Sequence, residues 1–206
     1  MDRIRQALAA ALLGLACALP AAAAEYKAPP VSRDTRELAQ WVLQKSDHGA
    51  RAFAIVDKKS AHLYIFDASG RLQGDTPVLL GQQPGDDSAP NVGEHAQQGF
   101  VPFHERTTPA GRFEAEAGVN DTGEQVIWVD YDSAFAIHRL RPGRAMRDRE
   151  ARLRSTDMAE RRASSGCVVV PVRFFEDVVL RWLGESRSVV YVLPESGSAR
   201  DIAGSL

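Results

Sequence analysis

Short runs of β-branched and aromatic residues, separated by turn residues, constrain the fold of this chain more than any other feature. Phe53–Asp57 and His62–Phe66 flank Lys58-Lys59-Ser60, and this spacing predicts a β-hairpin. The pattern as a whole predicts a mainly β domain. Further strands are predicted at 77–80, 112–117, 126–137, 168–170 and 188–193.

Two helices complete the predicted fold. Arg33–Lys45 carries apolar residues on one face, with Ser32 as a candidate N-cap. Pro171 can open a second helix, which the apolar spacing of 174–183 continues. Between two predicted strands, 82–99 is a long polar loop, and loops of this length are usually functional or mobile.

The first residues predict export. Arg3 and Arg5 precede an apolar stretch, 7–19, that is too short to cross a bilayer as a helix. The alanines that end at Ala24 match a signal-peptidase site, so we expect a signal peptide at 1–24 and a periplasmic protein. Acylation of Cys17 is the alternative, but its surroundings match a lipoprotein signal poorly. No later stretch is long and apolar enough to form a transmembrane helix.

Composition excludes some classes of partner. The formal net charge is −2, whereas a nucleic-acid-binding protein usually carries a strong basic excess, so we expect no nucleic-acid partner. No pattern indicates a cofactor, and we expect a monomer. After the signal peptide, we expect a helix and linker at 25–49, one folded domain at 50–194 and a flexible tail at 195–206.

Cys167 is the candidate reactive residue. The chain has two cysteines, and only Cys167 remains once the signal peptide is removed, so it cannot form an internal disulfide. A nucleophile, an intermolecular link and a small buried hydrophobe are the three explanations that stay open. The preceding Gly166 and the upstream His138 favour the nucleophile.

His138 is the candidate base. It follows the apolar run 134–137, so a strand would hold its ring. An imidazole beside a thiol is the usual means of generating a thiolate. A structural histidine at a strand end is the alternative. The other four histidines have no spacing that indicates a metal site, and we expect none.

Gly166 and Ser165 complete the candidate catalytic group. Gly166 permits unusual dihedral angles before the nucleophile, so the amides of Gly166 and Cys167 could face a developing oxyanion. Ser165 could donate a further hydrogen bond there, or it could only stabilise the turn. Pro109 and Gly111 fit a type I turn, which we interpret as scaffold.

These residues resemble the YkuD-type L,D-transpeptidase catalytic domain. In that family a histidine at a strand end precedes a Ser/Thr-His-Gly-Cys signature, which His138, Ser164, Gly166 and Cys167 match in part. The segment 107–113, Thr-Thr-Pro-Ala-Gly-Arg-Phe, resembles a second family motif. The resemblance covers most of the chain and implies an L,D-transpeptidase-like β-sandwich or barrel, with the region up to residue 194 as its catalytic domain.

The chain departs from the family pattern at three points. Ser165 replaces the usual histidine, Val169 replaces the usual Asn or Arg, and 139–163 is longer than the usual connection. The first two departures leave the binding of the acyl acceptor open. The third implies an inserted helical lid beside the site.

The insertion is rich in arginine, with nine between residues 139 and 162. Most of them are expected to form solvated ion pairs along a helix. Arg162 and Arg139 lie near the candidate nucleophile and base, and a guanidinium binds a carboxylate through its planar fork. We therefore expect Arg162, Arg139 and the signature residue Ser164 to bind substrate.

The resemblance implies a periplasmic cysteine peptidyltransferase that acts on peptidoglycan stem peptides through an acyl-enzyme on Cys167. Transfer of the acyl group to water would make the protein a carboxypeptidase or a hydrolase of the same linkages. A non-catalytic murein-binding protein is the alternative from another class. The sequence does not choose among these acceptors.

Overall fold

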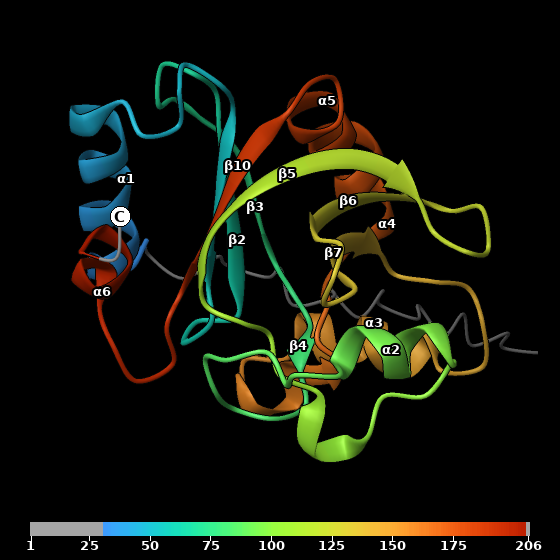
Figure 1. Ribbon diagram of the computed structural model, residues 1–206. Helices are drawn as coiled ribbons and strands as arrows, with labels where there is room; N and C mark the ends of the chain where they lie inside the picture. Colours follow the sequence, from blue (N-terminus) through green and yellow to red (C-terminus); the bar gives the residue numbers. More distant parts are fainter. Residues whose placement is uncertain (1–30, 205–206) are drawn as a thin grey trace, which may run out of the picture.

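The structure, a computed structural model, describes residues 31–204, so the predicted signal peptide lies outside the described residues. Its strands are β1 Phe53–Asp57, β2 His62–Phe66, β3 Leu72–Pro77, β4 Leu80–Gly81, β5 Gly111–Val119, β6 Gln125–Asp130, β7 Phe135–Arg139, β8 Arg162–Ser164, β9 Val168–Val170 and β10 Ser188–Leu193. Eight of them form one sheet in the order β3-β2-β1-β10-β5-β6-β7-β9, and β4 pairs with β8 (Figure 1).

The helices are short apart from the first. They are α1 Arg33–Lys45, α2 Val92–Gln97, α3 Met146–Arg154, α4 Val172–Phe174, α5 Leu180–Leu183 and α6 Ala199–Ala203. A π-helical turn, Phe175–Val179, joins α4 to α5, and single 3₁₀ turns lie at Phe103–Glu105 and Ala159–Arg161. Among residues 31–204, no helix has both the length and the hydropathy needed to cross a membrane.

The two edges of the large sheet are joined through Leu79. β3 ends at Pro77, and Leu79 then exchanges two backbone hydrogen bonds of 2.9 Å with Val169 of β9. β5 bends across from β10 to β6 as a long arch (Figure 1). The sheet is therefore nearly closed, which protects edge strands from pairing with other chains. The predicted fold class, mainly β with packed helices and a helical insertion, is confirmed.

β1 is buried on both faces and separates two apolar layers. Ala54 and Val56 lie in the larger layer, which the helical segment 172–183 covers. Phe53 and Ile55 lie in the second layer, under α1 and α6. Successive side chains of a strand point to opposite faces, so five buried residues in a row serve both layers.

The two ends of the described chain meet over this second layer. α1 begins as predicted, because the Ser32 hydroxyl accepts a hydrogen bond from the Thr35 amide (3.1 Å). α6 lies in the segment that was expected to be a flexible tail. Ser198 and Asp201 form a capping box at its start, and Ile202 is buried against the second layer. Capping and apolar burial therefore order this polar segment.

Candidate active site

The segment 164–167 forms a turn whose hydrogen bonds fix the position of Cys167. The Ser164 hydroxyl accepts a hydrogen bond from the Gly166 amide (3.1 Å) and donates one to the Cys167 carbonyl (2.6 Å). Gly166 has a φ of +130°, and a Cβ at this position would lie 3.0 Å from the carbonyl oxygen of Thr107. The turn therefore requires glycine at 166, and the Ser164 hydroxyl is used within the turn itself.

Thr108 anchors the turn from the neighbouring segment. Its buried hydroxyl donates to the Gly166 carbonyl (2.7 Å) and accepts from the Gly81 amide (2.8 Å). The turn around Pro109, interpreted from the sequence as scaffold, thus holds the residue before the candidate nucleophile. Sequence reasoning did not single out Thr108, because the carbonyl that it binds is distant in the chain.

His138 lies in β7, and Cys167 directly precedes β9, the neighbouring parallel strand. His138 of β7 lies opposite Val169 of β9, and Cys167 precedes Val169 by two residues. The pairing of β7 with β9 therefore brings the turn that holds Cys167 next to the strand that holds His138. No hydrogen bond joins these two described side chains. The thiol instead donates to the carbonyl oxygen of Ala134 (3.5 Å).

The hydrogen bond of the His138 ring determines its tautomer. Nδ1 lies 2.8 Å from the carbonyl oxygen of Arg139. A carbonyl oxygen only accepts hydrogen bonds, so Nδ1 carries the proton and Nε2 is left with a lone pair. The neutral ring therefore has the form that a general base requires.

Burial keeps both members of the pair neutral. Burial, assisted by the positive charge of Arg141, lowers the pKa of His138 to about 4. Burial also raises the pKa of the Cys167 thiol, although a backbone hydrogen bond from Ala136 and the charge of Arg141 oppose this. The pair is thus a thiol and a neutral imidazole, so any reaction through a thiolate would require proton transfer from Cys167.

A pocket of about 90 Å³ lies beside Cys167. Ser165, Gly166 and Cys167 form one wall, and the turn that precedes β7 forms a second. Residues between Ser88 and Pro109, which we call the cover segment (88–109), form the rest; this segment includes α2. None of the described residues of the insertion (139–163) lines this pocket.

The cover segment is packed tightly onto the turn before β7. A Cβ at Gly93 of α2 would lie 1.9 Å from the carbonyl oxygen of Asp132, so only glycine permits this approach. An isolated helix of six residues is unstable in water, and α2 therefore depends on such contacts. The sequence predicts only a polar loop here, because the contact joins residues that are distant in the chain.

The arginines expected to bind substrate are paired with carboxylates. Arg162 forms an ion pair with Glu195 and donates hydrogen bonds to two backbone carbonyls. Arg139 and Arg141 both pair with Glu124, at 3.1 and 3.0 Å. Arg162 does not line the pocket at the nucleophile, so substrate binding by this residue stays a prediction that requires the Glu195 pair to open.

The insertion is anchored to the body of the protein. Its predicted helix is present as α3, and Leu153 packs against Leu79, Leu140 and Val169. Arg161 is fully buried and donates to backbone carbonyls, among them that of Ser155 at 2.7 Å. The i, i+4 pairing expected along the helix occurs between Arg152 and Asp148, at 2.8 Å.

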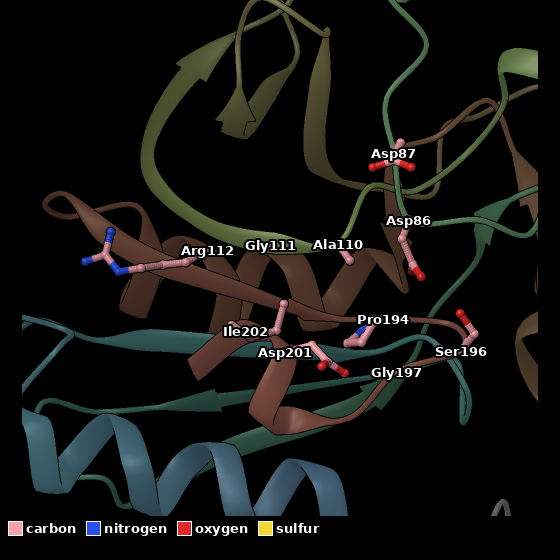
Figure 2. A pocket seen from close by; sticks show the side chains of 10 residues that line it. All are labelled: Asp86, Asp87, Ala110, Gly111, Arg112, Pro194, Ser196, Gly197, Asp201 and Ile202. Atoms are coloured by element: carbon pink, nitrogen blue, oxygen red, sulfur yellow. The ribbon is translucent and has the colours of Figure 1, made fainter. Parts of the chain in front are cut away.

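A larger cavity of about 550 Å³ adjoins the same segments (Figure 2). Asp87 and Ala110 line it, whereas their neighbours Ser88 and Pro109 line the pocket at the nucleophile. Figure 2 shows that Arg112 points away from the carboxylates of this cavity. The candidate nucleophile and base do not line it. Within residues 31–204, no group of three or more His, Cys, Asp or Glu is placed to hold a metal ion.

Comparisons with known proteins give low similarity. No protein-family model matches the chain, and no curated protein matches it. A mutant of the Enterococcus faecium L,D-transpeptidase is similar in structure, with 18% identity over 69% of this chain and 50% of that chain and a TM-score of 0.40. An L,D-transpeptidase from Xylanimonas cellulosilytica shows 15% identity over 69% of this chain and 60% of that chain, with a TM-score of 0.39. The match thus spans half the length of the Enterococcus protein.

Proposed function

We propose that this chain is a periplasmic cysteine peptidyltransferase that acts on peptidoglycan stem peptides. The observation that carries the proposal is a cysteine held in a glycine turn beside a pocket, with a neutral histidine on the adjacent strand. The motifs at 107–113 and 164–167 support the same reaction class through the resemblance stated above.

In the proposed first step, Cys167 attacks the carbonyl of an L-centred residue in the stem peptide. The thiol turns away from the Ala134 carbonyl and gives its proton to Nε2 of His138, which later protonates the departing D-alanine. Catalytic hydrogen bonds are often long or absent without substrate and tighten when it binds. The product is a thioester on Cys167 and a free D-amino acid.

Charge develops on the carbonyl oxygen during this step. The Gly166 amide already donates to Ser164, so it is not free for the oxyanion. The amide of Cys167 and the hydroxyl of Ser165 are the donors that we propose for this role. Ser165 is exposed and lines the pocket, which suits a group that meets substrate.

A mass measurement tests the proposal. Wild-type protein incubated with a tetrapeptide muropeptide should gain the mass of the stem without its terminal D-alanine, and Cys167→Ala should gain nothing. His138→Gln should slow adduct formation by about a hundredfold or more, because general-base assistance is lost. If the wild type gains no mass, the enzyme proposal is wrong and the murein-binding alternative remains. Chromatography of the released products distinguishes transfer to an amine from hydrolysis.

A further inference from the structure

The described lining of the pocket at Cys167 has one acidic residue, Glu105. Glu105 ends the 3₁₀ turn Phe103–Glu105, is 9% exposed and lines the pocket. Among the described residues that line the pocket, Glu105 is the one whose side chain carries a formal charge at neutral pH. The acylation step proposed above makes no use of it.

Two histidines contact the carboxylate of Glu105. Nδ1 of His95 lies 2.7 Å from one carboxylate oxygen, and Nε2 of the exposed His104 lies 3.6 Å from the other. Within residues 31–204, no lysine or arginine forms an ion pair with Glu105. The adjacent Arg106 is directed elsewhere and donates to the side chain of Gln82 (2.6 Å). No described lysine or arginine therefore balances the negative charge of Glu105, and a cationic ligand could do so.

A carboxylate in a mostly apolar pocket selects ligands by charge. It attracts an ammonium group and repels a carboxylate, and both effects are stronger than in bulk water. A stem peptide ends in a carboxylate, whereas an alkyl amine is an ammonium ion at neutral pH. A volume of about 90 Å³ suits an amino group with its nearest methylenes and is too small for a whole stem.

We infer that this pocket receives the acyl acceptor, a primary amine, and that Glu105 binds its ammonium group. The inference rests on the proposed function, because it requires a thioester on Cys167. It names the acceptor class that the sequence leaves open. It also makes Glu105 a residue that determines specificity for amines over water.

The proton balance of the transfer closes with His138 and water. The ammonium ion bound by Glu105 loses one proton to water before it reacts. The neutral amine then attacks the thioester carbonyl, so that a C–N bond forms and the C–S bond breaks. A second proton passes from the nitrogen through His138 to the departing sulfur. The products are an amide and the free thiol.

A purely structural role for Glu105 makes different predictions. The contact with His95 joins the 3₁₀ turn to α2, so Glu105 could serve only to hold the cover segment in place. Loss of such a support would disturb the pocket for every acceptor. Loss of an ammonium-binding group would affect only acceptors that arrive as cations.

Two acceptors distinguish these roles in Glu105→Gln. The acyl donor is the tetrapeptide muropeptide, and the acceptors are Nα-acetyl-lysine amide, a cation, and hydroxylamine, which is largely neutral at neutral pH. Aminolysis by the lysine amide should fall about tenfold to a hundredfold, the loss expected for one hydrogen bond to a charged group. Acylation of Cys167 and aminolysis by hydroxylamine should not change. Glu94→Gln, which alters an exposed carboxylate on α2, should leave all three rates unchanged.

Equal losses with both acceptors, or slower acylation, would overturn the inference. His95→Asn keeps the carboxylate and removes its partner, so it should retain a preference for the lysine amide over hydroxylamine. Loss of that preference to the same extent as in Glu105→Gln would assign Glu105 a structural role. If the wild type forms no acyl-enzyme at all, the proposed function fails, and this outcome is separate from either result for Glu105.

Discussion

Two long polar segments lie near the turn of Cys167 and the strand of His138, and their contacts with the rest of the protein differ. The cover segment lines the pocket and supplies the one acidic residue of its described lining, the buried Glu105. The insertion packs through Leu153 against the body of the protein and lines no part of that pocket. Length and polarity therefore do not identify which loop meets the substrate; the contacts of each loop with the strands do.

The two segments also differ in the charge that they bring. The cover segment contributes the carboxylate of Glu105, on the side of the nucleophile where we propose that the acceptor binds. The insertion contributes Arg141 and Arg149, whose positive charges lower the pKa of His138. A negative acceptor side and a positive base side suit a reaction in which a cationic amine replaces a residue that carries a free carboxylate.

The largest effect is expected from Gly93→Ala in the cover segment. The added Cβ would lie 1.9 Å from the Asp132 carbonyl oxygen, so α2 has to move away from the turn before β7. Misplacement by about 1 Å can cost about a hundredfold in rate, and we expect a loss of that size in acyl transfer. Gln97→Ala, an exposed change on the same helix, is the control. Full activity in Gly93→Ala would show that the position of the cover segment does not affect acyl transfer.

Leu153→Ala in the insertion should act on stability. Leu153 is 4% exposed and packs on Leu79, Leu140 and Val169, so truncation should lower the free energy of unfolding by about 2–4 kcal/mol. Urea unfolding measures this change. The rate of acyl transfer, measured where the variant is fully folded, should stay close to the wild-type rate. A large loss of rate under those conditions would mean that the insertion also shapes the pocket.

The smallest effect is expected from Arg141→Gln. Removing this positive charge makes protonation of His138 easier, so the pKa of His138 should rise from about 4 toward its ordinary value. The base works only when it is unprotonated, and the fall in acylation rate at low pH should therefore begin at a higher pH. Because burial is the larger cause, most of the shift should remain. Arg144→Gln, an exposed change nearby, should leave the pH profile unchanged, and equal profiles for both variants would contradict the assignment.

Local signals made the strands and the first helix predictable. The β1–β2 hairpin follows from two apolar runs and a short polar turn, and the N-cap of α1 follows from Ser32. α2 has no comparable signal. Its existence depends on the close approach of Gly93 to Asp132, which joins residues that are distant in sequence.

The residues of the candidate site likewise fall into those that the sequence predicts and those that only the fold identifies. Cys167 and Gly166 stand out in the sequence because a single cysteine follows a glycine. Arg161 and Arg162 are adjacent and chemically identical, yet only the fold makes Arg161 fully buried and pairs Arg162 with Glu195. Glu105 gives no sequence signal, since its burial depends on His95 and the pocket walls.

The Ala134 carbonyl has a consequence for the chemical durability of the protein. Ala134 has a φ of +53°, which is uncommon for a residue with a side chain, and its carbonyl oxygen accepts the thiol proton of Cys167. Peroxides and disulfides react with the thiolate rather than the thiol, so a protonated, hydrogen-bonded Cys167 oxidises slowly. Residues 31–204 hold no second cysteine that could trap an oxidised sulfur as a reversible disulfide. In an oxidising compartment, we therefore expect the rate of irreversible Cys167 oxidation to depend on how often the thiol leaves that carbonyl without substrate.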